Sequence, residues 1–293
     1  MHIVILANSG SWYARDLTRA AASCGHHVTV EPFASLTASV QTGRCIVTAG
    51  SGTDLSSCDA VIVRTMPPGS LEQVVLRMNL LGILEGQGIK VINSARAVEC
   101  AVDKYLTTAR LMAAGLPVPE TVVCETAELA SEAFDRLGGD VVVKPIFGAE
   151  GRGILRVSDP DLAMRTFRTL ERIDAVLYLQ RFIPHEGFDV RVMVLDGRVL
   201  GGMRRYNAQD FRTNVSREGR PEAVTLTATE EDWAVRAAAA VGTRIAGVDI
   251  LYDRSGEGYV IEVNGVPGWQ AFRKVTGCDV AMEVIQSLER SES

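Results

Sequence analysis

Residues 141–157 read VVVKPIFGAEGRGILRV. The first four are typical of a strand that ends in Lys144, and a glycine-rich loop follows them. The glycines of this loop are Gly148, Gly151 and Gly153. Glycines let backbone N–H groups approach a phosphate closely, and Lys144 would place a positive charge beside it. Residues 154–157 favour a second strand, so the unit is strand-loop-strand and not the strand-loop-helix of a dinucleotide site. We interpret it as a phosphate-binding flap, with a plain surface hairpin as the alternative.

Three oxygen-bearing side chains lie on two strand-like segments near the C-terminus, GVDILY and YVIEVNGVPG. Glu262 and Asn264 are two residues apart, so both project from one face of a strand, and Asp249 on a paired strand could complete the set. Carboxylate and amide oxygens suit Mg²⁺, with phosphates and waters as further ligands. Solvated acids beside a turn are the alternative. The apolar flanks disfavour it, because half-burying these groups without a cation would be costly.

A basic segment, GMRRYNAQDFRTNVSREG at residues 202–219, stands out in a chain with a net charge of −6. Its arginines are Arg204, Arg205, Arg212 and Arg217. Arginine side chains suit carboxylate and phosphate oxygens, including the charge that spreads during phosphoryl transfer. A solvated loop is the ordinary reading of such a segment. Proximity to a magnesium and phosphate site would favour a functional one.

The elements that must position these groups alternate between strands and helices at the start of the chain. The patterns predict a strand at residues 3–6, a helix at 12–23 and a strand at 27–30. Such alternation indicates a parallel sheet covered on both faces. The pattern changes near residue 93, where we place a domain boundary. Beyond it we expect α+β character, including a hairpin that turns at Asp196-Gly197.

The composition excludes several classes of protein. The 293 residues are 47% hydrophobic and 23% charged, as in a globular protein. The net negative charge disfavours nucleic acid as a partner. The six cysteines include no C-x-x-C pair, so neither a zinc site nor a disulfide framework is indicated. We find no signal peptide or membrane-spanning run, and expect a cytoplasmic protein without a membrane partner.

Several motifs in order resemble the ATP-grasp superfamily, and more narrowly the RimK-type branch of amino-acid and glutamate ligases. They are Asp103-Lys104, Lys144-Pro145 with the glycine loop, Gln180 to Pro184, Asp189 to Arg191, Asp210 to Asn214, Asp249, and Glu262 to Asn264. The resemblance covers residues 90–285 and implies an α/β ATP-grasp fold, α+β in its C-terminal half. It implies a Rossmann-like N-terminal domain at 1–93, a central lid domain at 94–181 and a C-terminal catalytic domain at 182–293.

The same resemblance implies roles for the residues that bind nucleotide. Lys104 and Lys144 would contact the ATP phosphates, and the loop from Gly148 through Gly151 to Gly153 would close over them. A hinge would hold adenine through backbone groups, with Asp189 beside the ribose. The hinge residues are Gln180, Arg181, Phe182 and Ile183.

Further implied roles concern the transferring phosphoryl group, the metal and the substrate. Arg212 and Asn214 would join Lys144 in catalysis by steadying the phosphoryl group and the acyl phosphate. One or two Mg²⁺ or Mn²⁺ ions would be held by Asp249, Glu262 and Asn264. The candidates for the substrate carboxylate are Arg191 and Arg204.

The resemblance implies an ATP-dependent carboxylate-amine ligase that forms an acyl phosphate and passes the acyl group to an amine. L-Glutamate would be added to a carboxylate acceptor, which could be a protein tail, a carrier or a pterin cofactor. Residues 269–273, WQAFR, resemble ligases associated with methanopterin-type cofactors. A nucleotide-binding module without ligase activity and a ligase for another amino acid are the alternatives. We expect a homo-oligomer, either a dimer or a tetramer.

Overall fold

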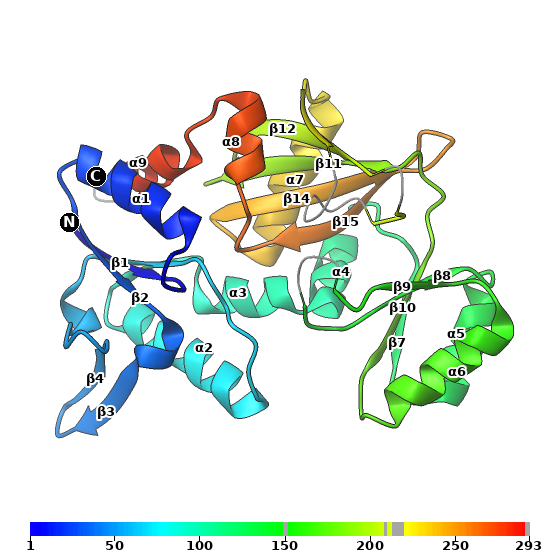
Figure 1. The fold of residues 1–293 in the computed structure, drawn as a ribbon, viewed down its shortest axis with the longest axis horizontal. Coiled ribbons are helices and arrows are strands. Elements are labelled where there is room, and N and C mark those ends of the chain that lie inside the picture. The colour runs from blue at the N-terminus through cyan, green and yellow to red at the C-terminus, as the bar shows by residue number, and fades with distance from the viewer. Residues whose placement is uncertain (149–151, 208–209, 213–219, 291–293) are drawn as a thin grey trace.

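The computed structural model describes residues 1–148, 152–207, 210–212 and 220–290. Within them lie three principal sheets, seen from left to right in Figure 1 as the N-terminal sheet, the C-terminal sheet and the sheet of the central segment. No helix in these ranges is long and apolar enough to cross a membrane.

The first sheet is parallel and has the strand order β2-β1-β5-β6. Its strands are β1 (His2–Leu6), β2 (His27–Glu31), β5 (Ala60–Val63) and β6 (Lys90–Ile92). Helix α1 (Trp12–Ser23) covers one face, and α2 (Leu71–Gly86) covers the other. The sequences IVIL and AVIV are buried on both faces, as parallel strands between two helical layers require.

Short elements lie between these strands and were not anticipated. They are the 3₁₀ turns η1 (Phe33–Ser35) and η2 (Leu55–Ser57) and the antiparallel hairpin of β3 (Thr37–Gln41) with β4 (Arg44–Thr48). The residues of β3 are all exposed, so no buried face gave its sequence a periodic pattern.

The second sheet is antiparallel, with the order β7-β10-β8-β9. Its strands are β7 (Thr121–Cys124), β8 (Val141–Lys144), β9 (Leu155–Val157) and β10 (Leu177–Arg181). Helices α5 (Ala127–Arg136) and α6 (Pro160–Glu171) cover one face, where Phe134 packs edge-on against Phe167. The other face turns toward the third sheet (Figure 1).

Two consecutive helices, α3 (Ala95–Val102) and α4 (Lys104–Ala113), run beneath the C-terminal sheet in Figure 1 and lead toward the second sheet. Asp103 separates them and caps α4, because its carboxylate accepts the Leu106 N–H at 2.9 Å. Lys104 is therefore the first residue of α4 and holds a fixed position at the helix start.

The third sheet is antiparallel and has the order β13-β12-β11-β14-β15. Its strands are β11 (Phe188–Leu195), β12 (Arg198–Tyr206), β13 (Arg220–Val224), β14 (Ile245–Tyr252) and β15 (Gly258–Asn264). The expected hairpin at Asp196-Gly197 joins β11 and β12, and both turn residues have positive φ. Helix α7 (Ala228–Val241) covers one face, where Val192 and Val248 are buried. The opposite face therefore carries the alternate residues, including Arg191 and Asp249.

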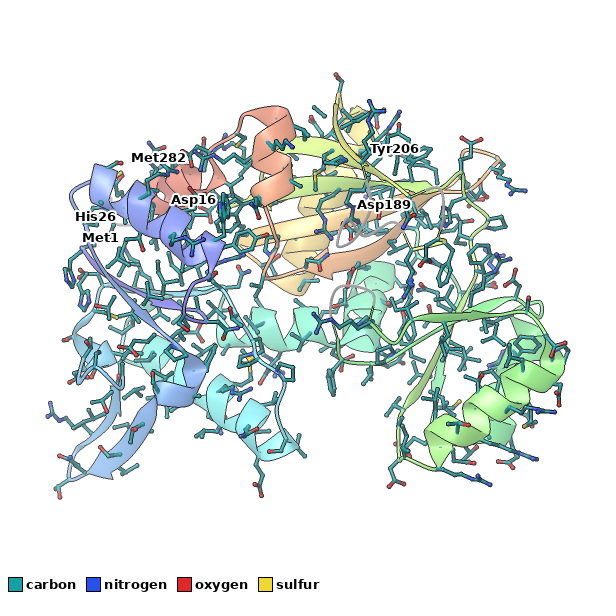
Figure 2. The ribbon with its side chains drawn as sticks, viewed as in Figure 1. Met1, Asp16, His26, Asp189, Tyr206 and Met282 are labelled. Atoms are coloured by element: carbon teal, nitrogen blue, oxygen red, sulfur yellow. The ribbon has the colours of Figure 1, made fainter. Side chains whose placement is uncertain are left out.

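The C-terminal helices return to the first sheet. Helix α8 (Gln270–Thr276) and helix α9 (Val280–Arg290) share one hydrophobic core with α1, β1 and β5. Asp16 on α1 accepts hydrogen bonds from Trp269 Nε1 at 3.0 Å and from Arg273, which ties α1 to the start of α8 (Figure 2). The first and last parts of the chain are thus packed together, and the domain boundaries near residues 93 and 181 stay a prediction.

Asn93 joins the end of the first sheet to the third. It is fully buried, and its Nδ2 donates to Ile245 O at 2.7 Å and Gly265 O at 2.6 Å. Its Oδ1 accepts from the backbone N–H groups of Arg244 and Ile245 at 2.7 and 3.0 Å. One side chain therefore satisfies four backbone groups between β6 and the strands β14 and β15.

Asn93→Ala should lower the free energy of unfolding by about 3 kcal/mol or more, because it leaves several buried backbone groups without partners. Chemical denaturation monitored by circular dichroism measures this. The exposed Asn8→Ala is the matched control, with an expected change within about 0.5 kcal/mol. A loss below about 1 kcal/mol for Asn93→Ala would contradict this account of the junction.

Candidate active site

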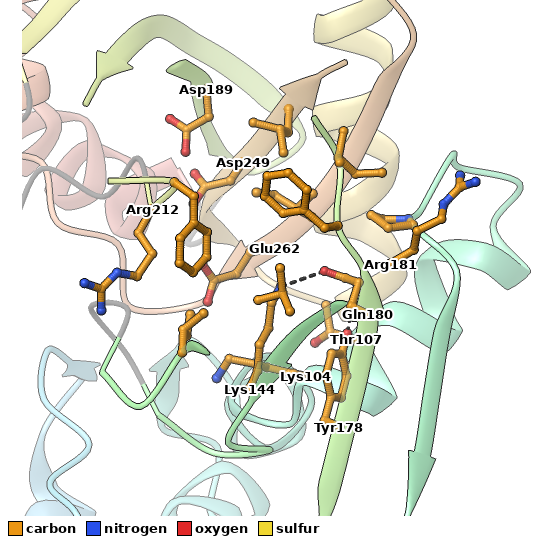
Figure 3. A pocket seen from close by; sticks show the side chains of 18 of the residues that line it. Lys104, Thr107, Lys144, Tyr178, Gln180, Arg181, Asp189, Arg212, Asp249 and Glu262 are labelled. Atoms are coloured by element: carbon orange, nitrogen blue, oxygen red, sulfur yellow. Dashed lines mark hydrogen bonds between the residues drawn. The ribbon is translucent and has the colours of Figure 1, made fainter. Parts of the chain in front are cut away.

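A cleft lies between the second and third sheets, with a volume of about 920 Å³ that includes the space open to solvent at its mouth. Its walls come mainly from α4, β8, β10, β14 and β15 (Figure 3). The predicted site residues that line it are Lys104, Lys144, Gln180, Arg181, Phe182, Ile183, Asp189, Arg212, Asp249 and Glu262.

Lys144, at the end of β8, provides a buried ammonium group in this cleft. Its Nζ donates to Gln180 Oε1 at 2.7 Å (Figure 3). Gln180 is itself fixed, because its Nε2 donates to Thr121 Oγ1 at 3.0 Å and to the Tyr178 hydroxyl at 3.2 Å. Burial lowers the pKa of Lys144 to about 8, against the opposing influence of the Glu262 carboxylate.

Lys104 provides a second ammonium group from the start of α4. Its Nζ donates to Gly148 O at 2.7 Å, and its backbone N–H donates to Ile146 O at 3.2 Å. Burial lowers the pKa of Lys104, while Glu262 acts in the opposite direction. The start of the glycine loop is thus anchored to α4, and Gly148 has a φ of 144°, which favours glycine.

The carboxylates lie on the opposite wall, on adjacent strands of the third sheet. Asp249 on β14 pairs in register with Glu262 on β15. The Asn264 side-chain nitrogen lies 3.4 Å from Asp249 Oδ2, so its amide group lies beside the carboxylate. The three residues predicted to hold a metal are therefore neighbours on one face of the sheet.

Asp249 also belongs to a buried chain of acids and arginines. Arg191 donates to both of its oxygens at 2.6 Å, and Arg205 Nη2 lies 2.9 Å from its Oδ2. Arg205 in turn pairs with Asp189 through two hydrogen bonds, one of 2.7 Å from Nε. These arginines hold the pKa of Asp249 below its ordinary value despite its burial, so its carboxylate is ionised.

The chemistry of these donors fits a hard divalent cation. Two carboxylates and an amide supply the oxygen ligands. Among the residues that the structure describes, no cluster of three or more His, Cys, Asp or Glu side chains could hold a metal without other ligands. Such a set leaves coordination positions for phosphate oxygens and waters, which is typical of Mg²⁺ bound with a nucleotide. The two ammonium groups across the cleft would face the same phosphates.

Other predicted residues lie elsewhere. Arg191 is held by Asp249, so a contact with substrate would require that ion pair to open. Arg204 lies on the other face of β12 from Arg205 and is stacked over Phe188, with its guanidinium carbon 5.2 Å from the ring centre. Gly153 has a φ of 73° at the end of the glycine loop. Gly151 and Asn214 lie outside the described residues.

The structure brings to the site some residues that no sequence pattern singled out. Arg205 was noted only as part of the basic segment. Neighbouring residues of β12 point to opposite faces of the sheet, so either Arg204 or Arg205 could face Asp189. The choice depends on which face of β12 is covered by the rest of the protein, which is a long-range property. Thr107, Tyr178 and His185 also line the cleft and belong to no motif.

Comparison with known proteins identifies the family to which the chain belongs. A model of the RimK-like ATP-grasp domain matches residues 101–288, and a model of the RimK PreATP-grasp domain matches residues 1–98. The chain belongs to the RimK-like ATP-grasp family. The tetrahydromethanopterin:α-L-glutamate ligase of Methanosarcina acetivorans is 35% identical over 263 residues, which cover 80% of this chain and 81% of the relative. A probable α-L-glutamate ligase of Picosynechococcus is 30% identical over 99% of this chain and 96% of its own.

Solved structures of the family share the fold. The ATP-grasp ligase PsnB, in complex with a minimal precursor, Mg and ADP, superposes with a TM-score of 0.76 and 25% identity. The match covers 99% of this chain and 97% of PsnB. The predicted RimK-type membership and the ATP-grasp fold are confirmed, and the named relatives are enzymes that use this fold as ligases. ATP-dependent amide formation is consistent with them, and the family uses ATP and Mg²⁺.

Nucleotide binding should depend on pH through Lys144. Its pKa of about 8 means that the ammonium loses its proton as the pH rises through that value, and the charge facing the phosphates is lost. Affinity for ADP with Mg²⁺ should then fall by up to about tenfold per pH unit above 8. Calorimetric titration from pH 7 to 9.5 measures this. Lys144→Arg, which keeps its charge, should flatten the dependence, and a constant wild-type affinity would refute the role of Lys144.

Proposed function

We propose that the chain is an ATP-dependent α-L-glutamate ligase, which joins the amino group of L-glutamate to an activated carboxylate. The observation that carries the proposal is the arrangement of charge across the cleft. Lys104 and Lys144 lie on one wall of the cleft, and Asp249 and Glu262 lie on the other. The choice of glutamate rests on the two curated relatives named above.

We place the nucleotide along β10. Adenine would lie against Phe182 and Ile183, because these residues line the cleft and the Ile183 backbone amide donates to no acceptor among the described residues. The backbone amides of Arg181 and Phe182 already donate to Glu120 O and Asp140 O at 2.9 Å, which fixes this segment. Asp189 would lie toward the ribose.

The phosphates would extend from this segment to Lys144 and Lys104, beneath the glycine loop. Mg²⁺ would be held by Asp249, Glu262 and Asn264 and would neutralise charge on the phosphate oxygens. We propose one or two ions. Arg212, which lines the cleft and pairs with Asp210, would add a positive charge near the transferring phosphoryl group.

The reaction needs no side-chain nucleophile. A substrate carboxylate oxygen attacks the γ-phosphorus of ATP, the bond to the bridging oxygen breaks, and ADP leaves. The amine of glutamate then attacks the acyl carbon, and phosphate leaves as the amide forms and the amine loses its proton. Lys104, Lys144 and Arg212 stabilise the charge that develops on the phosphoryl oxygens, so catalysis comes from positioning and electrostatics.

The acceptor would be a carboxylate on a small molecule, a cofactor or a peptide. One relative is named for tetrahydromethanopterin, and PsnB has been solved in complex with a precursor peptide, which supports considering both a cofactor and a peptide. We further propose that residues 1–93, 94–181 and 182–293 act as pre-ATP-grasp, lid and catalytic domains. The homo-oligomer of two or four chains stays a prediction.

Glu262→Gln should reduce turnover by about a hundredfold or more, because it removes a preorganised charge that faces the phosphates and the metal. The control is Glu257→Gln, which changes an exposed carboxylate in the turn of the same hairpin and should leave turnover unchanged. Coupled assays of ADP release at saturating substrate measure both variants. Equal rates for Glu262→Gln and wild type would rule out Glu262 as a metal ligand.

The reaction itself is tested with purified protein, ATP, Mg²⁺, single amino acids and fractions of a cell extract. ADP release should require both an amino acid and an acceptor fraction, and mass spectrometry should find a product heavier by one glutamyl residue. A product carrying another amino acid would overturn the assignment of glutamate. Nucleotide binding with no product under any condition would overturn ligase activity.

A further inference from the structure

Arg64 occupies the position where an open parallel sheet ordinarily binds ligands. In the order β2-β1-β5-β6 the chain direction of the connections reverses between β1 and β5, and ligands bind outside the carboxyl ends of the strands at such a point. Arg64 is the first residue after β5, and its backbone N–H donates to Leu6 O, at the end of β1, at 2.9 Å. It therefore lies at the reversal itself.

The guanidinium group of Arg64 is enclosed by two aromatic rings from distant parts of the chain. Its central carbon lies 4.9 Å from the centre of the Tyr13 ring and 4.2 Å from that of Trp269. The two rings pack edge to face, 5.1 Å apart. The residue as a whole is only 6% exposed. Tyr13 and Trp269 therefore fix the plane of the guanidinium group.

This buried cation has no acidic partner in the described residues. Nη2 donates to Pro267 O at 2.8 Å, whereas Nε is buried and makes no hydrogen bond. Burial lowers the pKa of Arg64 to about 10, which still leaves it charged at neutral pH. By contrast, the equally buried Arg205 pairs with Asp189 and Asp249.

An unpaired buried charge is expensive, so a partner supplied by a ligand would relieve the cost. The partner must be an anion, and the planar guanidinium fork suits a carboxylate. The aromatic walls attract the cation but supply no hydrogen-bond acceptor for Nε. The local structure therefore favours a carboxylate from outside the chain.

The surroundings connect Arg64 to the catalytic cleft. Pro267, its hydrogen-bond partner, is three residues beyond Asn264 on the loop that leaves β15. A side-chain carbon added at Gly247 would lie 3.1 Å from Pro267 Cβ and 3.5 Å from Arg191 Nε, so Pro267 and Arg191 come together over this glycine. Arg64 and Arg191, the partner of Asp249, thus both lie close to Pro267 in the loop after β15.

We propose that Arg64 binds the carboxylate of a substrate that is not being phosphorylated, either on the incoming amino acid or on the acceptor, at the junction of the first sheet and the loop after β15. This site rests on the proposed ligase function. It would place the substrate with its charged end against the first sheet and its reacting end toward Asp249 and Glu262. The pre-ATP-grasp part of the chain would then contribute directly to substrate recognition.

Equilibrium dialysis tests the site without turnover. Wild type, Arg64→Met and Arg77→Met are loaded with a non-hydrolysable ATP analogue and Mg²⁺, and binding of L-glutamate and of an α-linked glutamyl peptide is measured separately. Arg77 on α2 is the matched control, since it is also a buried arginine that donates to a proline carbonyl, from its Nη1 to Pro67 O at 2.6 Å. A peptide whose carboxylates are amidated is the neutral probe.

Arg64→Met should weaken binding of one carboxylate probe about ten- to hundredfold, the scale of one charged hydrogen-bonded contact, and Arg77→Met should not. The probe that is affected shows whether the carboxylate belongs to the amino acid or to the acceptor. Arg64→Lys should restore part of the affinity. The unfolding temperature of unliganded Arg64→Met should stay close to that of wild type, because removal of the unpaired buried charge offsets the lost hydrogen bond to Pro267 and the lost ring contacts.

Two outcomes would overturn the inference. In one, wild type binds neither probe, or Arg64→Met binds both as wild type does. In the other, Arg64→Met unfolds at a markedly lower temperature and loses nucleotide as well as both probes, which would mean that Arg64 only supports the fold. If Arg64 governs carboxylate binding yet no ADP forms with any amino acid, the proposed function fails while the site stands.

Discussion

Two ammonium groups and two carboxylates face each other across the cleft, and each is largely removed from water. Burial lowers the pKa values of Lys104 and Lys144. Within the described residues their ammonium groups donate to Gly148 O and Gln180 Oε1 and contact no carboxylate. Glu262 influences both from the opposite wall. Such an arrangement costs stability until a ligand brings anionic oxygens to the ammonium groups and a cation to the carboxylates. A metal-bound triphosphate does both.

The scaffold keeps the carboxylate wall in place through a buried chain of alternating acids and arginines. Asp189, Arg205, Asp249 and Arg191 lie on three neighbouring strands and neutralise one another in turn. Asp249 therefore stays ionised although it is buried, which a metal ligand requires. The same pairing keeps Arg191 from the substrate unless a cation competes for Asp249. If Asp249 holds the metal as proposed, a bound cation would compete with Arg191 for its carboxylate.

Patterns local in sequence were predictable, and long-range contacts were not. Helix α1 spans Trp12–Ser23 as expected, because its serine cap, its glycine stop and its spacing of apolar residues all lie within one segment. The shared face of Glu262 and Asn264 was predictable because side chains alternate along a strand, whereas the register that sets Asp249 opposite Glu262 is a long-range contact. The enclosure of Arg64 joins residues more than 200 positions apart, and nothing near it in the sequence signals which rings will cover it.

Transfer of oxygen-18 from a carboxylate to phosphate shows directly whether the protein activates that carboxylate as an acyl phosphate. A glutamyl peptide acceptor with both carboxylate oxygens labelled is turned over with ATP, Mg²⁺ and L-glutamate, and the released phosphate is analysed by mass spectrometry. One labelled oxygen is expected in each phosphate released, because the attacking carboxylate oxygen stays bonded to phosphorus when the amine displaces phosphate from the acyl carbon. Unlabelled phosphate accompanying amide formation would contradict it.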